Sequence, residues 1–261
     1  MSQNAKYWFM KQVTGGILRI LLLIVSILIS AAQPAQAMHI TEGLLPWKVA
    51  SFWFVVALPF VAAGIWQMTQ RKKLSPTYMP MVGIFGAAVF VFSCLPIPIP
   101  AVGATAHPAG TGFSAILLGP LPSVVVAFVS LLLQGLFLAH GGLTTLGANT
   151  FSMGVLGSFA GFITFFIARN LRVNLFWSGF LAGAMADFFT YLGTAIGLAS
   201  GLHGSGSYLS EIISIFTILT PYVMALMVIE GMITGGILVY VRNHRPDILR
   251  RLKIIPPEEG S

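Results

Sequence analysis

A histidine follows a small-residue cleavage motif near the start of the chain, and this arrangement can generate a metal chelate. The stretch Ala35-Gln36-Ala37-Met38-His39-Ile40 contains the Ala-x-Ala pattern that is typical of signal-peptide cleavage sites. Cleavage after Ala37 would leave a mature chain that begins with Met38 and His39. The new α-amine of Met38, the His39 amide nitrogen and the His39 Nδ1 could then bind one metal ion in fused five- and six-membered rings.

The segment before this site has the composition of a signal peptide. It combines an apolar core from Ile20 to Ile29 with the basic residues Lys6, Lys11 and Arg19. The core is shorter than the about 20 residues that a membrane-spanning helix needs. If the chain stayed uncut, residues 12–32 could still span a membrane, and His39 would lie in an ordinary loop. We favour cleavage and predict that residues 1–37 are a signal peptide.

His107 is the best candidate for a fourth donor, because the chelate fills only three corners of a square. It lies in Ala106-His107-Pro108-Ala109-Gly110-Thr111-Gly112, where proline and small residues favour irregular backbone. Taken by itself, His107 would be read as a hydrogen-bonded core or loop histidine. Because the topology puts it on the same side of the membrane as the Met-His terminus, we predict that it is a metal ligand. Planar nitrogen donors suit Ni(II) or Cu(II) and can impose low-spin Co(II), whereas Mg(II) and Ca(II) prefer oxygen. The amide must lose its proton, so affinity should rise with pH.

Other polar residues have weaker sequence signals. His140 could be a fifth ligand, a partner that orients His39 or His107, or an interfacial histidine, and we favour the orienting or structural role. Asn149 could bond a ligand imidazole or irregular backbone, or cap a helix, and Glu42 could anchor the terminal segment. Acids within apolar segments are often functional, but the sequence assigns no specific role to Asp187, Glu211, Glu230 or the loop residue His203.

The elements that position these residues are predicted to be membrane helices. The chain has 261 residues, of which 56% are hydrophobic and 8% are charged, and its mean hydropathy is +0.89. A soluble domain of this length does not have such a composition, so we predict an all-α polytopic membrane protein. The net charge of +7 does not indicate nucleic-acid binding, because most basic residues lie in the signal or in clusters that flank the membrane.

The positions of the basic clusters indicate about seven crossings. Six apolar segments are evident, at about residues 49–68, 79–97, 121–139, 144–168, 174–199 and 211–241. Six crossings from an outer N-terminus would place Arg169, Arg172 and the basic C-terminal residues outside, against the positive-inside rule. A broken crossing at about residues 101–119 removes this conflict, and such a segment must be buried in protein or line a cavity. The outer side is then approached by His39, His107, His140 and His203.

The predicted organisation is a signal peptide, one transmembrane metal-binding domain at residues 38–241 and a basic cytoplasmic tail at residues 242–261. The chain carries no Gly-Lys-Ser/Thr phosphate-binding motif, so we expect that it cannot hydrolyse ATP alone. We expect neither enzymatic activity nor a permanently bound cofactor.

Three stretches resemble the CbiM/NikM family. They are the predicted mature start Met38-His39-Ile40-Thr41-Glu42-Gly43-Leu44-Leu45-Pro46, the His107-Pro108-Ala109-Gly110-Thr111-Gly112 run, and Ala139-His140-Gly141-Gly142-Leu143-Thr144-Thr145-Leu146-Gly147-Ala148-Asn149. That family comprises the substrate-binding membrane subunits of energy-coupling factor transporters for cobalt and nickel. The likeness covers essentially the whole mature chain, and three ordered motifs within a seven-span frame make it specific.

The resemblance implies a site and a set of partners. The mature N-terminus would fold back into the bundle, and Met38, His39 and His107 would coordinate the ion. The partners would be a transmembrane coupling subunit, a small CbiN-type membrane subunit and cytoplasmic ATP-binding subunits. The protein would be multi-pass in a prokaryotic inner membrane, with its mature N-terminus outside and its C-terminus in the cytoplasm. The loop motifs look like those of cobalt-type members, in which import feeds cobalamin synthesis, whereas the square nitrogen set by chemistry alone favours Ni(II).

Two other function classes stay open on the residues alone. An intramembrane hydrolase would need a nucleophile and a base in facing helices. Ser152 or Ser158 with His140 is the least poor pairing, and neither serine has a Gly-x-Ser-x-Gly setting. A vitamin-binding subunit of the same transporter class would need an aromatic-lined pocket and would be indifferent to the Met-His terminus.

Overall fold

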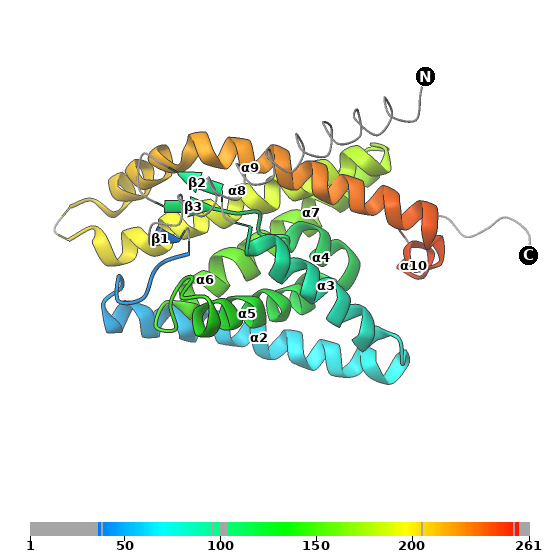
Figure 1. The fold of residues 1–261 in the computed structure, drawn as a ribbon, viewed down its shortest axis with the longest axis horizontal. Coiled ribbons are helices and arrows are strands. Elements are labelled where there is room, and N and C mark those ends of the chain that lie inside the picture. Colours follow the sequence, from blue (N-terminus) through cyan, green and yellow to red (C-terminus); the bar gives the residue numbers. More distant parts are fainter. Residues whose placement is uncertain are drawn as a thin grey trace, which may run out of the picture.

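A computed structural model describes residues 36–37, 39–95, 97–99, 104–204, 206–252 and 254–255. The predicted signal segment up to residue 35, the proposed ligand Met38 and residues 101–103 of the broken crossing lie outside these residues. The described chain is a bundle of long helices whose axes run mostly along the length of the molecule (Figure 1). The prediction of an all-α polytopic membrane protein is confirmed.

Among the described residues, five helices are long and apolar enough to cross a membrane. Four of them are α2 (Trp47–Leu74), α5 (Pro120–Phe137), α8 (Leu175–Leu202) and α9 (Tyr208–His244). The fifth runs from Leu146 to Asn170 and consists of α6 (Leu146–Asn149), the π-helix η1 (Thr150–Gly157) and α7 (Ser158–Asn170). A shorter apolar helix, α3, covers Tyr78–Ser93. Each of the six apolar segments of the sequence therefore forms a helix.

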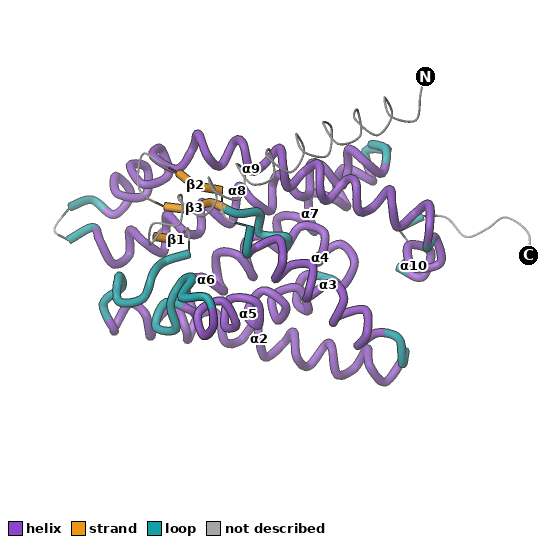
Figure 2. The backbone as a smooth tube through the Cα atoms, viewed as in Figure 1, coloured by secondary structure: helices purple, strands orange, loops and turns teal. Residues whose placement is uncertain are grey.

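The remaining predicted crossing is broken, as expected, over its described residues 104–119. Strand β3 (Ala104–Ala106) leads into four residues without regular structure, and the short helix α4 (Thr111–Leu118) follows. The four irregular residues 107–110 and all eight residues of α4 are buried, which is the environment that irregular backbone in a membrane protein requires. In the described chain, β3 pairs antiparallel with β2 (Ile97–Ile99) and parallel with β1 (Gln36–Ala37), which forms the small sheet in Figure 2.

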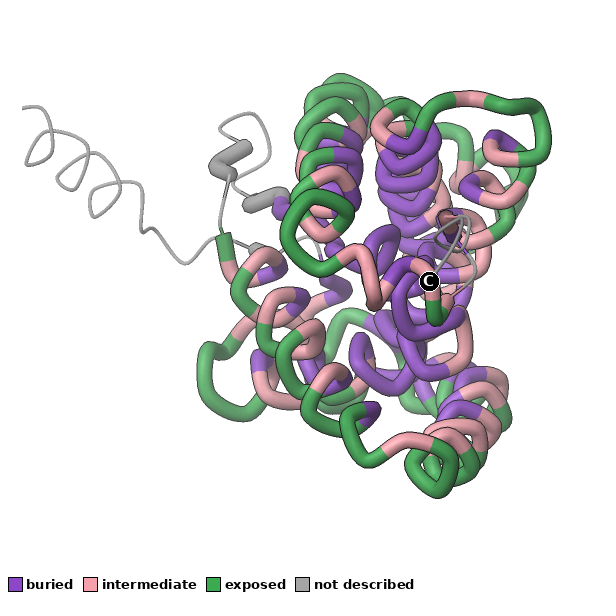
Figure 3. Tube along the Cα trace, turned by 90° about the vertical axis from the view of Figure 1, so that its right-hand side faces the viewer, coloured by how far each residue is buried: buried purple, intermediate pink, exposed green. Residues whose placement is uncertain are grey.

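Buried and exposed residues separate cleanly across the bundle. Buried positions face the interior and exposed positions the outside (Figure 3). Many exposed residues are large and apolar, such as Trp66 and Ile213, and an apolar outer surface suits a lipid environment. The predicted tail is partly packed: α9 continues to His244, α10 covers Pro246–Arg251, and Leu249 is fully buried in the main hydrophobic core.

Glycine allows α8 and α9 to approach closely. A Cβ atom at Gly235 would lie 2.7 Å from the carbonyl oxygen of Phe176 and 3.0 Å from the Phe176 ring. The neighbouring Gly236 is exposed and has no atom within 4 Å of an added Cβ. Two adjacent glycines of one helix thus differ in whether the contact between helices requires them.

We predict that Gly235→Ala and Gly236→Ala have opposite effects on stability. Overpacking at Gly235 should destabilise the fold by about 1–3 kcal/mol, whereas alanine at Gly236 should be neutral or stabilise α9 by up to about 1 kcal/mol. Thermal unfolding of both variants in one detergent measures the difference. Equal melting temperatures would show that the close contact between α8 and α9 does not depend on Gly235.

Candidate metal centre

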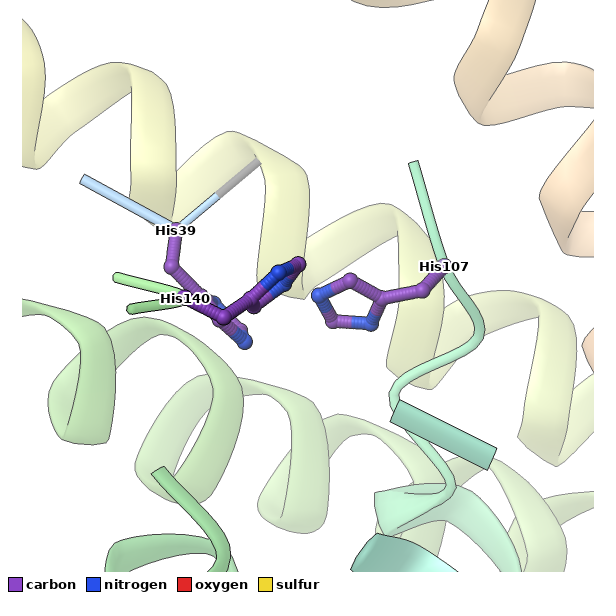
Figure 4. Close-up of side chains that lie close together, drawn as sticks. All are labelled: His39, His107 and His140. Atoms are coloured by element: carbon purple, nitrogen blue, oxygen red, sulfur yellow. The ribbon is translucent and has the colours of Figure 1, made fainter. Parts of the chain in front are cut away.

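Three histidine side chains from distant parts of the sequence converge inside the bundle (Figure 4). His39 lies in the segment before α2, His107 in the irregular run before α4, and His140 in the connection between α5 and α6. One ring nitrogen of each lies within 4.8 Å of the others. The ring centroids of His39 and His107 are 4.5 Å apart, and each lies 5.2 Å from that of His140. His39 and His107 are buried and His140 is half-buried.

The three rings present nitrogen atoms that lack a protein partner. Within the described residues, the Nε2 atoms of His39, His107 and His140 are buried and make no hydrogen bond. The Nδ1 of His107 lies 3.2 Å from the carbonyl oxygen of Pro108. A carbonyl only accepts, so Nδ1 carries the proton and Nε2 presents its lone pair to the cluster. Buried polar atoms without partners are uncommon, and three imidazoles together form a donor set that suits a transition metal.

The protonation states of His39 and His140 also suit metal binding. Burial lowers the pKa of His39 well below its ordinary value, and the neighbouring His107 and His140 lower it further, while interaction with Gln134 only partly opposes the shift. Burial lowers the pKa of His140 as well. Both rings are therefore neutral at pH 7, which is the form that binds a metal ion.

The segment that carries His39 is held by side chains at the start of the Leu146–Asn170 helix. The Ile40 amide donates to Asn149 Oδ1 at 2.8 Å, and Asn149 Nδ2 donates back to the Ile40 carbonyl at 3.1 Å. The Thr145 hydroxyl donates to the same carbonyl at 2.5 Å. Asn149 thus bonds irregular backbone, one of the alternatives that the sequence left open, and fixes the residue next to His39.

The two glycines after His140 make room for this segment. Gly141 has φ +81°, and a Cβ atom there would lie 3.1 Å from the Cβ of His39. A Cβ atom at Gly142 would lie 2.6 Å from both the Cα and the amide nitrogen of Glu42. The Glu42 carboxylate accepts from the Thr144 amide at 3.1 Å, and hydrogen bonding to Thr144 lowers the pKa of Glu42. The His-Gly-Gly motif therefore forms a cradle for the terminal segment.

The structure brings together most of the residues singled out from the sequence. His39, His107, His140, Asn149 and Glu42 gather in one region, whereas Met38 lies outside the described residues. His203 is elsewhere, with its Nδ1 2.8 Å from the carbonyl oxygen of Ala199.

Sequence reasoning missed two residues of this region. Thr145 donates to the Ile40 carbonyl, as described above. Gln134 is fully buried, its backbone carbonyl accepts from the His140 amide at 3.2 Å, and its side-chain Nε2 donates to Ser93 Oγ at 2.6 Å. The only available signal was a lone amide side chain in the apolar run of α5.

The serine pairings that a hydrolase would use are not formed in the described structure. The Ser152 hydroxyl donates to the carbonyl oxygen of Asn149 at 3.1 Å, and the Ser158 hydroxyl donates to Ser123 Oγ at 2.9 Å. Both hydroxyl hydrogens are therefore directed away from His140.

Comparisons with known proteins show which family the chain resembles. Residues 39–248 match the model of the CbiM family, described as the cobalt uptake substrate-specific transmembrane region. The chain is 47% identical over 224 residues to the cobalt transport protein CbiM of Geobacter sulfurreducens, a match that covers 86% of this chain and 65% of that protein. It is 46% identical over 224 residues to the cobalt transport protein CbiM of Sorangium cellulosum, covering 86% of this chain and 100% of that protein. The crystal structure of a truncated transition metal transporter has a TM-score of 0.69 and 25% identity, over 79% of this chain and 99% of that one.

We predict that Gly142→Ala weakens binding of a divalent transition metal while leaving the bundle folded. The added methyl would displace the backbone of Glu42 and with it the segment that carries His39. Gly142 does not have a positive φ, so alanine tests the contact and not the backbone conformation. The control is Gly83→Ala, because no atom lies within 4 Å of a Cβ there. Calorimetric titration of both variants measures the effect, and equal affinities would contradict the cradle.

Proposed function

The chain belongs to the CbiM family of cobalt uptake substrate-specific transmembrane regions, and from that premise we propose that its mature form binds Co(II) at the outer side of a prokaryotic inner membrane for ATP-driven uptake. The observation that carries this proposal is the convergence of the His39, His107 and His140 rings, in which the His107 Nε2 makes no hydrogen bond within the described residues, next to the predicted cleavage site. Ni(II) is the alternative ion, because a square of nitrogen donors suits it at least as well.

Signal cleavage would complete the donor set. In the uncut chain the Met38 nitrogen belongs to a peptide bond and is not a free amine. The uncut site would therefore rely on the imidazole nitrogens as donors. After cleavage, the Met38 amine, the His39 amide nitrogen and the His39 Nδ1 form the chelate, and His107 Nε2 supplies the fourth nitrogen. The position of His39 supports this assignment, because its ring contacts that of His107. His140 is the most exposed of the three, and its ring would pack against the rings of His39 and His107 and help to orient them.

The ends of the helices support the proposed orientation. Basic residues occupy the last turns of α2, α7 and α9, namely Arg71, Lys72, Lys73, Arg169 and Arg242. In Figure 1 the ends of α2 and α9 point to one end of the bundle, opposite β1 and β3, which adjoin the histidine segments. Basic residues mark the cytoplasmic side, and this supports the proposal that the histidine cluster lies toward the outside and the C-terminus inside.

The proposed transport cycle needs partner subunits. As a substrate-specific component, the chain would work with a transmembrane coupling subunit, a small CbiN-type membrane subunit and ATP-binding subunits. Hydrolysis of ATP by those partners would drive release of the ion to the inside, where cobalt would feed cobalamin synthesis. The chain itself would bind and release the ion without catalysing a reaction.

We predict that high-affinity metal binding requires the free amine of Met38. Mature protein starting at Met38 should bind one Co(II) per chain, whereas protein with one additional N-terminal alanine should lose the five-membered amine ring and bind far more weakly. Visible absorption during titration with Co(II), Ni(II) and Cu(II) measures affinity and ranks the ions. Equal binding by both forms would exclude the chelate.

We predict graded effects for the three histidines. His39→Ala and His107→Ala should each abolish high-affinity binding, because each removes a nitrogen that contacts the ion. His140→Ala should reduce affinity by about 10–100-fold, as expected for a group that supports the ligands. His203→Ala is the matched control and should bind like the parent protein. Loss of binding in the His140 variant equal to that in the other two would instead make His140 a ligand.

A further inference from the structure

The loop that carries His107 is held by hydrogen bonds to one side chain of α8 and one side chain of α9. Glu230 in α9 is buried, and both oxygens of its carboxyl group accept from backbone amides: Oε2 from Ala109 at 2.6 Å and Oε1 from Gly110 at 3.0 Å. Tyr191 in α8 is also buried, and its hydroxyl donates to the carbonyl oxygen of His107 at 3.0 Å. These bonds satisfy the polar groups of a backbone that lies outside regular structure.

One peptide group connects the Glu230 carboxyl group to the His107 ring. The amide of Ala109 donates to Glu230 Oε2, and the carbonyl of the same peptide, that of Pro108, accepts from His107 Nδ1 at 3.2 Å. A peptide group is planar and rigid, so fixing its N–H also fixes the direction of its carbonyl. The carbonyl in turn orients the imidazole whose Nε2 points into the histidine cluster.

The chemistry of this chain of contacts resembles that of metal sites in general. Histidine ligands usually donate their second ring N–H to a carboxylate or a carbonyl, which fixes the ring and raises the basicity of the ligand nitrogen. Here a carboxyl group acts on the ring through one peptide group, and successive hydrogen bonds polarise one another in a low-dielectric interior. Both Glu230 oxygens act as acceptors, one for each of the two backbone amides.

We propose that Glu230 and Tyr191 are positioning residues for the metal site, with Glu230 acting on His107 through the Pro108–Ala109 peptide group. The inference rests on the proposed metal-binding function. It makes the direction and donor strength of His107 Nε2 depend on the packing of α8 and α9 against the loop. An acidic residue within an apolar helix then has a function that the sequence did not assign.

The test replaces Glu230 with glutamine, which keeps the shape of the side chain but replaces one of its two acceptor oxygens with an NH2 group that cannot accept. Mature Glu230→Gln protein should bind Co(II) about 10–100-fold more weakly, and the absorption bands of the bound ion should shift because His107 is reoriented. Tyr191→Phe should cause a smaller loss in the same direction. The matched control is Thr234→Val, which alters a fully buried side chain of α9 whose hydroxyl has no partner in the described structure.

Melting temperatures of the metal-free proteins separate positioning from a purely structural role. A weaker affinity and shifted bands, at a melting temperature like that of Thr234→Val, support the proposal. Parent-like affinity and bands in Glu230→Gln overturn it, as does a weaker affinity that follows a lower melting temperature with unchanged bands. If Glu230→Gln does not fold, Tyr191→Phe decides, and parent-like binding and bands there overturn the proposal. A parent protein that binds no Co(II) would instead contradict the proposed function itself.

Discussion

The constraint on which the rest of the structure depends is that irregular backbone inside a membrane bundle must find its hydrogen bonds within the protein. In the run between β3 and α4, the hydroxyl of Tyr191 and the carboxyl group of Glu230 supply partners for the His107 carbonyl and the amides of Ala109 and Gly110. At the other end of α4, Arg71 donates to the carbonyl oxygen of Leu118. These polar contacts hold the broken segment in the core. The break allows His107 to reach the histidine cluster from irregular backbone and not from the surface of a continuous helix.

The segment that carries His39 and Ile40 is also irregular, and its backbone groups are bonded by different partners. Its residue Ile40 is bonded on both sides by Asn149 and on its carbonyl also by Thr145. Two segments without regular structure therefore meet at His39 and His107, and each is fixed by side chains from helices that are themselves rigid. The proposed site would combine ligands from backbone and side chains, because irregular backbone can bring its own nitrogen atoms to an ion.

The parts of this structure that follow from local composition could be predicted, and those that depend on distant contacts could not. Long apolar runs define the helices, and the positions of basic residues required a further crossing, which Pro108 and its neighbouring glycines showed to be broken. The histidine motifs indicated the site because His39 lies beside a cleavage motif and His107 within that crossing. The role of Glu230 was not predictable, because its partners lie 120 and 121 residues away and an acid within an apolar run does not identify its donors. The packed C-terminal segment around Leu249 and the π-helix likewise arise from tertiary packing.

The way the ligands are held also bears on how an ion could leave. His107 is oriented through a few hydrogen bonds to α8 and α9, each of which contributes about 0.5–1.5 kcal/mol between neutral groups or about 1.5–3 kcal/mol when one partner is charged. A displacement of α9 relative to α4 would break both bonds from Glu230 at once and turn the Pro108–Ala109 peptide group, without unwinding a helix. A site held by the packing of two helices can thus lose its geometry through a rigid shift, whereas one built on a single helix would have to unfold locally.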